Sequence, residues 1–211
     1  ITFHVDAVQA LAKIPTEKYL IERVDFATFS SHKFHGVRGV GFVYIKSGKK
    51  ITPLLTGGGQ ERDYRSTTEN VAGIAATAKA LRLSMEKLDI FTSKTGQMKA
   101  VIRQALLDYP DIFVFSDEKD FAPHILTFGI KGVRGEVIVH AFEDYDIFIS
   151  TTSACSSKAG KPAGTLIAMG VDKDKAQSAV RLSLDLENDM SQVEQFLTKL
   201  KLIYNQTRKV R

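Results

Sequence analysis

The segment FSSHKFHG, residues 29–36, tells most about the architecture of this chain because it follows an apolar strand with a lysine and several phosphate-binding groups. Ser30, Ser31 and His32 can donate hydrogen bonds to phosphate oxygens at the strand's carboxyl end, where open α/β sheets bind ligands. A lysine amine has an ordinary pKa of about 10.4, so Lys33 needs burial or nearby positive charge to attack a carbonyl. Taken alone, the segment also fits a solvated polar turn.

A short strand near the start of the chain carries an aspartate. Residues 3–6 are predicted to form this strand, which ends at Asp6, and the amide of Gln9 follows three residues later. A carboxylate in that place can hold the pyridinium nitrogen of pyridoxal phosphate protonated, which makes the cofactor an electron sink.

A glycine-rich loop and a helix start follow at residues 57–70, GGGQERDYRSTTEN. Ser66 and Glu69 fit a capping box, so we expect a helix N-terminus there that favours an anion. The apolar residues beyond it recur at helical spacing and share one predicted face: Val71, Ile74, Ala75, Ala78 and Leu81.

Five segments, in this order and spacing, resemble the cysteine desulfurases, pyridoxal-phosphate enzymes of the class V aminotransferase group. They are HVDAVQ (4–9), SSHK followed by GVRGVGFVY (30–44), GGGQERDYRSTTENVAG (57–73), SACSSK (153–158) and VRLSL (180–184). The resemblance implies an α/β fold of type I, similar to aspartate aminotransferase. Residues 1–88 would belong to the large cofactor-binding domain, and residues 89–211 would form the small α/β domain.

The same resemblance assigns the site residues. Lys33 forms the imine with pyridoxal phosphate and acts with His32 and Cys155 in catalysis. The other cofactor contacts fall to Asp6 at the ring nitrogen, Gln9 at the phenolic oxygen, Ser30 and His32 at the phosphate, and Thr68 at the phosphate of the neighbouring subunit in a homodimer.

Cys155 is the only cysteine, which excludes an internal disulfide and a multi-cysteine metal site within one chain. It lies among small polar residues that cannot pack a core, and Lys158 could lower its thiol pKa. A small buried cysteine is the alternative. The resemblance makes Cys155 the nucleophile that takes the substrate sulfur as a persulfide.

Arg181 lies near the start of a predicted strand, residues 180–184, in which apolar and polar residues alternate. The pattern alone does not tell which face of this strand points into the protein. The planar guanidinium of Arg181 suits a carboxylate, although a solvated edge-strand arginine fits the pattern equally well. The resemblance assigns it to the substrate α-carboxylate. The chain departs from the family at Ser31 and Asp185, where glycine is common, and at Val37, where proline is usual.

Composition favours a soluble globular chain in the cytoplasm. Hydrophobic residues make up 44% and charged residues 25%, and no apolar run could span a bilayer. A single thiol fits a reducing compartment. The net charge of +5 is spread along the chain without a recognition motif, so we expect no direct nucleic-acid binding and no membrane partner. His124 and His140 are interpreted as structural or surface groups, and no metal site is expected.

The second half of the chain is predicted to alternate strands and helices after a boundary at residues 89–96. Met98, Val101, Ile102, Ala105 and Leu106 share a helix face. Strands are predicted at 112–115, 125–128, 147–149 and 180–184, and helices near 135–145, 161–170 and 191–204.

The resemblance implies an enzyme that converts L-cysteine to L-alanine and passes sulfur through Cys155 to an acceptor protein, such as an iron-sulfur scaffold or a tRNA-thiolation enzyme. A selenocysteine lyase or another class V aminotransferase is the nearest alternative. Because the chain begins at Ile1 with a cofactor residue already in its first strand, we expect roughly the second half of such an enzyme. A noncatalytic fragment that acts as a scaffold is a further alternative.

Overall fold

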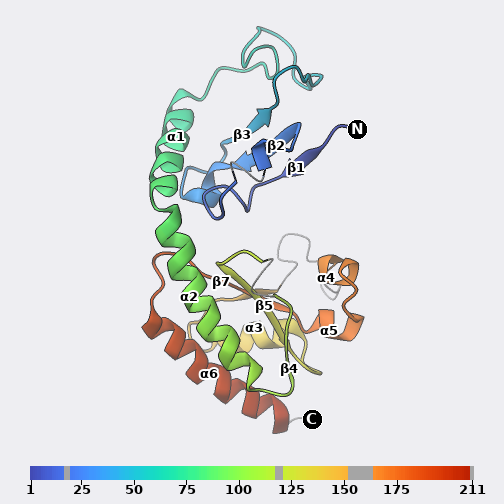
Figure 1. Cartoon of the computed structure of the whole chain (residues 1–211), viewed down its shortest axis with the longest axis vertical. Coiled ribbons are helices and arrows are strands. Elements are labelled where there is room, and N and C mark those ends of the chain that lie inside the picture. The colour runs from blue at the N-terminus through green and yellow to red at the C-terminus, as the bar shows by residue number, and fades with distance from the viewer. Residues whose placement is uncertain (17–19, 117–120, 152–163, 210–211) are drawn as a thin grey trace. The chain divides into compact units, whose positions relative to one another are not determined.

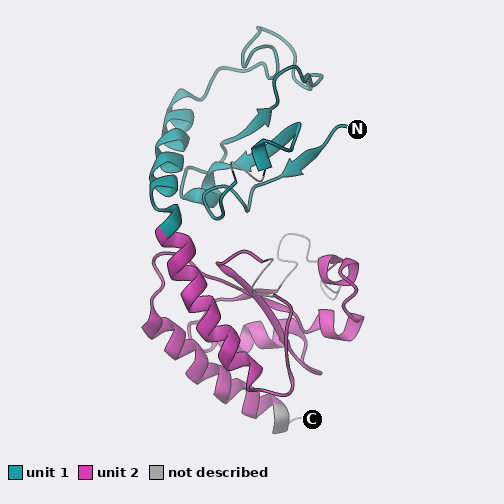
Figure 2. Cartoon of the chain, viewed as in Figure 1, with its two compact units in different colours: residues 1–89 teal, residues 90–211 magenta. Residues whose placement is uncertain are grey.

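The chain folds into two compact units, residues 1–89 and residues 90–211, in a computed structural model that describes residues 1–16, 20–116, 121–151 and 164–209 (Figures 1 and 2). None of the described helices is long and apolar enough to cross a membrane. Each unit has its own sheet.

Unit 1 is built on a three-stranded sheet in the order β1-β2-β3, with bounds His4–Asp6, Phe26–Ser30 and Gly41–Ile45. β1 pairs with β2 in parallel, and β2 pairs with β3 in antiparallel orientation. Small and aromatic side chains from β2 and its neighbours form the core: Ala7, Val24, Ala27 and Phe29. The predicted first and second strands are confirmed.

Asp25 ties the start of β1 to the turn after β3. Its carboxylate accepts a hydrogen bond from Phe3 N at 2.9 Å and forms an ion pair with Lys49 Nζ at 3.1 Å. The backbone bond, followed by the lysine, holds the pKa of this carboxyl below its ordinary value.

The helix after the glycine-rich loop starts later than predicted. α1 spans Val71–Glu86, and its N-cap is Asn70, whose side chain accepts a hydrogen bond from Gly73 N at 3.0 Å. The predicted capping box of Ser66 and Glu69 is therefore wrong. Asparagine caps as well as serine does, and the first apolar residue follows it directly.

The buried face of α1 also differs from the predicted apolar stripe. Gly73 and Thr77 are buried, whereas Val71 is 71% exposed and Ile74 is 45% exposed. The helix packs against the 3-10 helix η2 (Ser31–Phe34), and only its small side chains leave room for that contact. Hydrophobic periodicity detects helix faces made of apolar residues, so it misses a helix face that consists of small residues.

A single helix, α2 (Leu88–Leu107), runs through the boundary segment predicted at residues 89–96, and the two units divide within this helix, between Asp89 and Ile90. The segment has no proline, and its one helical glycine, Gly96, costs only about 1 kcal/mol, too little to end a 20-residue helix. The predicted buried face is confirmed at Met98, Ile102 and Leu106, while Val101 is exposed.

Unit 2 contains a four-stranded antiparallel sheet in the order β4-β5-β7-β6. The strands are β4 (Ile112–Val114), β5 (Ile125–Ile130), β6 (Ser150–Thr151) and β7 (Val180–Ser183). The helices are α3 (Gly135–Glu143), α4 (Gly164–Ala168), α5 (Lys173–Gln177) and α6 (Met190–Lys209). Side chains of α2, α3 and α6 pack with those of β5 and β7 in one large core.

The strand predicted at residues 147–149 is displaced to Ser150–Thr151, and its first residue, Ile147, belongs instead to a motif that ends α3. Asp146 has a left-handed φ of 57°, and its N donates to the Glu143 carbonyl oxygen at 3.0 Å. Ile147 N donates to the Phe142 carbonyl oxygen at 3.1 Å, which completes a Schellman motif. The backbone can join β7 only after this motif.

Phe142 provides a test of the unit 2 core. It is fully buried and stacks on Phe196 with ring centroids 4.9 Å apart. We expect Phe142→Ala to lower the free energy of unfolding by about 3–5 kcal/mol, because it removes a buried ring and leaves a cavity. Phe148→Ala, at a position that is 78% exposed, should change it by less than about 0.5 kcal/mol. Denaturant unfolding measures both, and equal losses would contradict the packing described.

Candidate active site

The candidate active site of unit 1 lies where β1 and β2 end. The strands are parallel, and Asp6 at the end of β1 pairs with Thr28, two residues before Ser30 ends β2. Both carboxyl ends therefore open at one edge of the sheet, the edge at which open α/β sheets bind ligands. The structure thus brings Asp6 and Ser30 to the same edge.

The Asp6 carboxylate is exposed, and a local hydrogen bond orients it. Its Oδ1 accepts from Val8 N at 3.1 Å, a turn that aspartate commonly makes with the backbone two residues ahead. Ala7 N donates to the Thr28 carbonyl oxygen at 3.0 Å, which continues the strand pairing past Asp6. Gln9 is exposed in the turn that follows.

Lys33 lies on the 3-10 helix η2, which is anchored from two sides. The Phe34 side chain is only 1% exposed, and the carbonyl oxygen of Phe34 accepts a hydrogen bond from Ser84 Oγ of α1 at 3.1 Å. His35 ends the turn with a left-handed φ of 65°. Lys33 is half-buried and His32 is exposed, so both are presented on a firmly held support.

Ser31 points into the protein, contrary to its predicted role as a phosphate donor. It is fully buried, and its hydroxyl is hydrogen-bonded to the Thr77 hydroxyl of α1 at 2.9 Å. Gly36 faces the same hydroxyl so closely that an added Cβ would lie 1.9 Å from Ser31 Oγ. The small residues of this contact decide how closely α1 approaches η2.

The supporting residues Thr77 and Ser84 were not predicted as part of the site. Together with Gly73 they recur at helical spacing and share one side of α1. That stripe is the signal from which the contact with η2 could have been found.

Thr68 lies apart from the edge formed by β1 and β2. It is exposed in the segment before the Asn70 cap, and no hydrogen bond among the described residues joins it to Asp6 or Lys33. The preceding loop contains three consecutive residues with left-handed φ values of 51–67°: Glu61, Arg62 and Asp63.

Arg181, in unit 2, is half-buried on β7. Its neighbours Val180 and Leu182 are buried in the core, so the arginine lies on the opposite face of the sheet. Arg181 Nε is a buried donor that has no hydrogen-bond partner within the described part of the chain. A buried N–H donor of this kind is stabilised by a hydrogen bond to an acceptor such as a carboxylate.

Cys155 lies outside the described residues. The segment that contains it begins after Thr151, the last residue of β6, and ends before Gly164, the first residue of α4. Within β6, Ser150 pairs with Arg181, and Thr151, the last described residue before this segment, pairs with Val180.

The chain matches a family model described as aminotransferase class-V over residues 1–196. It is 48% identical over all of its 211 residues to the "NifS/IcsS protein homolog" of Lactobacillus delbrueckii subsp. bulgaricus, of which it covers 55%. It is 35% identical to "Cysteine desulfurase IscS" of Clostridium botulinum, with 100% of this chain and 53% of that protein covered.

Solved structures agree with these relatives. A chain titled "NIFS-LIKE PROTEIN" matches with a TM-score of 0.83 and 35% identity, over 96% of this chain and 52% of that one. A NifS-like protein from Rickettsia africae matches with a TM-score of 0.83 and 28% identity, over 97% of this chain and 54% of that one. The predicted α/β fold of type I is confirmed. The chain spans about half the length of the curated relatives it matches.

The contact between Ser31 and Gly36 gives a prediction for the support of Lys33. We expect Gly36→Ala to destabilise the protein by about 1–3 kcal/mol, because its methyl group would overpack against the Ser31 hydroxyl. In a Ser31→Gly background the same change should cost clearly less, with a coupling of about 0.5–3 kcal/mol in a double-mutant cycle. Denaturant unfolding of the four proteins measures the cycle. Additive effects would contradict this packing.

Proposed function

The chain belongs to the class V aminotransferase family, and from that premise we propose that it is the part of a cysteine desulfurase that carries the imine-forming lysine and the sulfur-accepting cysteine. The observation that carries the proposal is the placement of Asp6 and the segment from Ser30 to Lys33 at one sheet edge. The names of its relatives point to the same activity.

The residues at this edge fit pyridoxal 5'-phosphate, the cofactor of this family. Ser30 caps η2 without a side-chain hydrogen bond, so its hydroxyl can donate to a phosphate together with the exposed His32. The Asp6 carboxylate would hold the ring nitrogen and Gln9 the phenolic oxygen. When bound, the cofactor supplies an electron sink for carbanionic charge on the substrate. Thr68 would reach the phosphate of the neighbouring subunit in a homodimer.

Lys33 provides the amine and the proton transfers. Its side chain is half-buried, and the 3-10 helix that carries it is anchored by Phe34 and α1. The Nζ can therefore be held at one position during turnover. In the proposed role, Lys33 Nζ binds the cofactor carbonyl at rest and carries protons to and from substrate carbon during turnover.

Arg181 and Cys155 act on the substrate itself. The buried Nε of Arg181, which has no acceptor among the described residues, suits the α-carboxylate of L-cysteine. The Cys155 thiolate would attack the substrate sulfur, so that a sulfur–sulfur bond forms as the carbon–sulfur bond breaks. The carbon side keeps the electron pair and takes a proton to give L-alanine, and the enzyme keeps a persulfide.

The proposed partners follow from this product. A persulfide sulfur is delivered to an acceptor protein, for which an iron-sulfur scaffold and a tRNA-thiolation enzyme are the two candidate classes. One thiol per chain suits a reducing cytoplasm, where we place the protein.

The activity is tested on the complete protein loaded with pyridoxal phosphate, with a dithiol reductant that releases the persulfide sulfur as sulfide, by measuring alanine and sulfide formed from L-cysteine. We expect Cys155→Ala to abolish sulfide release while the cofactor stays bound, because only the nucleophile is lost. Lys33→Ala should lower alanine formation by a factor of about 10² or more, since the proton-transfer group is removed.

Lys46→Ala, an exposed lysine after β3, is the matched control and should keep full activity. Unchanged alanine and sulfide formation in Cys155→Ala would refute the desulfurase assignment. A keto acid as the product would favour an aminotransferase instead.

A further inference from the structure

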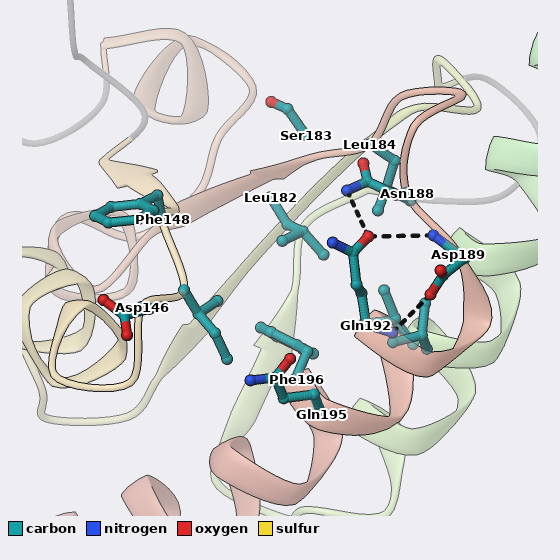
Figure 3. Close-up of a pocket in the computed structure, with 13 residues that line it drawn as sticks. Asp146, Phe148, Leu182, Ser183, Leu184, Asn188, Asp189, Gln192, Gln195 and Phe196 are labelled. Atoms are coloured by element: carbon teal, nitrogen blue, oxygen red, sulfur yellow. Dashed lines mark hydrogen bonds between the residues drawn. The ribbon is translucent and has the colours of Figure 1, made fainter.

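The polar side chains around a pocket in unit 2 are accounted for by the start of a helix. The pocket measures about 280 Å³ and is lined by residues of β7 and of the first turns of α6 (Figure 3). Asp189 accepts hydrogen bonds from Ser191 Oγ at 2.7 Å and from Gln192 N at 3.0 Å, which is the pattern of a helix N-cap. Gln192 Oε1 in turn accepts from Asn188 Nδ2 at 3.0 Å and from Asp189 N at 3.2 Å. These groups therefore serve α6.

In unit 1, a pair of buried hydroxyls joins the turn that carries Lys33 to α1. Ser31 of η2 is fully buried, and Thr77 of α1 is 7% exposed. Thr77 Oγ1 lies 2.9 Å from Ser31 Oγ and 2.7 Å from the Gly73 carbonyl oxygen. Both contacts lie within unit 1 and connect segments that are distant in sequence.

The direction of these two hydrogen bonds follows from the number of protons. A carbonyl oxygen can only accept, so the Thr77 hydroxyl donates to Gly73. A hydroxyl has one proton, so Thr77 has none left for Ser31, and the Ser31 hydroxyl donates to Thr77 Oγ1. Thr77 therefore provides the acceptor that the buried Ser31 hydroxyl requires.

The Ser31 side chain has little room to turn to another acceptor. An added Cβ at Gly36 would lie 1.9 Å from Ser31 Oγ, so the hydroxyl lies directly against the Gly36 backbone. Ser31 N donates to the Val40 carbonyl oxygen at 3.0 Å, and the Ser31 carbonyl oxygen accepts from Gly36 N at 3.0 Å. Because both backbone groups are bonded, a change in the hydroxyl's environment acts on the turn itself.

Lys33 lies between two points at which α1 holds this turn. Ser31 is bound to Thr77, and the carbonyl oxygen of Phe34 accepts a hydrogen bond from Ser84 Oγ at 3.1 Å. Thr77 and Ser84 are about two helical turns apart, so they share one side of α1. Since η2 is a single short turn, Ser31–Phe34, a shift of Ser31 moves the backbone of Lys33.

Loss of one hydroxyl and loss of both have different consequences. A buried donor that is left without an acceptor carries the full desolvation cost of that group, whereas removal of both partners can be nearly neutral. Ser31 is also one of the departures from the family, in which glycine is common at this position. A residue without a hydroxyl is therefore compatible with this turn.

We propose that Thr77 is a positioning residue for Lys33, and that it is required because Ser31 carries a hydroxyl. Thr77 accepts the Ser31 hydrogen bond, which keeps η2 seated on α1 and holds Lys33 Nζ at the place where it binds the cofactor. Neither hydroxyl contacts the cofactor in this role. The inference rests on the proposed function of Lys33.

The test is an absorbance titration of the complete protein with pyridoxal phosphate. It gives the dissociation constant of the cofactor and the pH at which the absorbance of the bound cofactor changes. We expect Thr77→Val to weaken cofactor binding about tenfold, because the Ser31 hydroxyl loses its acceptor and the turn moves. The pH midpoint should shift by about half a unit or more, because the pKa of the nitrogen that links Lys33 to the cofactor depends on where Nζ is held.

Variants at Ser31 separate positioning from packing. Ser31→Ala together with Thr77→Val removes both hydroxyls and should restore the dissociation constant and the pH midpoint to those of the unsubstituted protein. Ser31→Ala alone should have little effect, because the Thr77 hydroxyl still donates to Gly73. Thr77→Ser keeps the acceptor and should also bind the cofactor normally.

Thr95→Val is the matched control in unit 2. Thr95 is fully buried on α2, and its Oγ1 donates to the Phe91 carbonyl oxygen at 2.7 Å, the same bond to the carbonyl four residues earlier that Thr77 makes. Loss of such a helix bond is common to both variants. Thr95→Val should therefore leave the dissociation constant and the pH midpoint unchanged.

Two results would overturn the proposal: Thr77→Val that leaves both quantities unchanged, or a double variant that binds the cofactor about tenfold more weakly than the unsubstituted protein. The double variant decides the question even where Thr77→Val does not fold. Borohydride reduction and peptide mapping distinguish the two possible failures. No cofactor on Lys33 of the unsubstituted protein would overturn the proposed function as well, whereas labelled Lys33 with binding insensitive to Thr77→Val would overturn this inference alone.

Discussion

The parallel pairing of β1 with β2 is the constraint on which the unit 1 site depends. It sets the end of the first strand within two residues of the end of the second, so that Asp6 and Ser30 lie at one edge although they are distant in sequence. The turn after β2 then carries Lys33, and the buried Phe34 together with α1 holds that turn in place. Without this strand pairing, the carboxylate of Asp6 and the amine of Lys33 would not be brought to the same edge of the sheet.

Much of this arrangement could be predicted from the sequence, because strands and buried helix faces leave a periodic pattern. The first two strands and the buried residues Met98, Ile102 and Leu106 follow that pattern. The contact of α1 with η2 does not, because it uses the small polar residues Thr77 and Ser84 instead of apolar ones. Two backbones can approach each other closely where the side chains between them are small, and hydrophobic periodicity does not reveal such positions.

Local hydrogen bonds explain the other differences. Asn70 competes with Ser66 as a helix cap and lies directly before the first helical residue, so the helix starts there. The motif at Asp146 uses the backbone N–H of Ile147, the first residue of the strand that the sequence predicted at residues 147–149.

Peptide mapping shows directly whether Lys33 is the residue that binds the cofactor. The complete protein is incubated with pyridoxal phosphate, reduced with borohydride, digested and examined by mass spectrometry. We expect a pyridoxyl group on the peptide that contains Lys33, and its loss in Lys33→Ala with the overall fold retained. Modification confined to another lysine, or a Lys33 peptide that stays unmodified while the cofactor is bound, would contradict it.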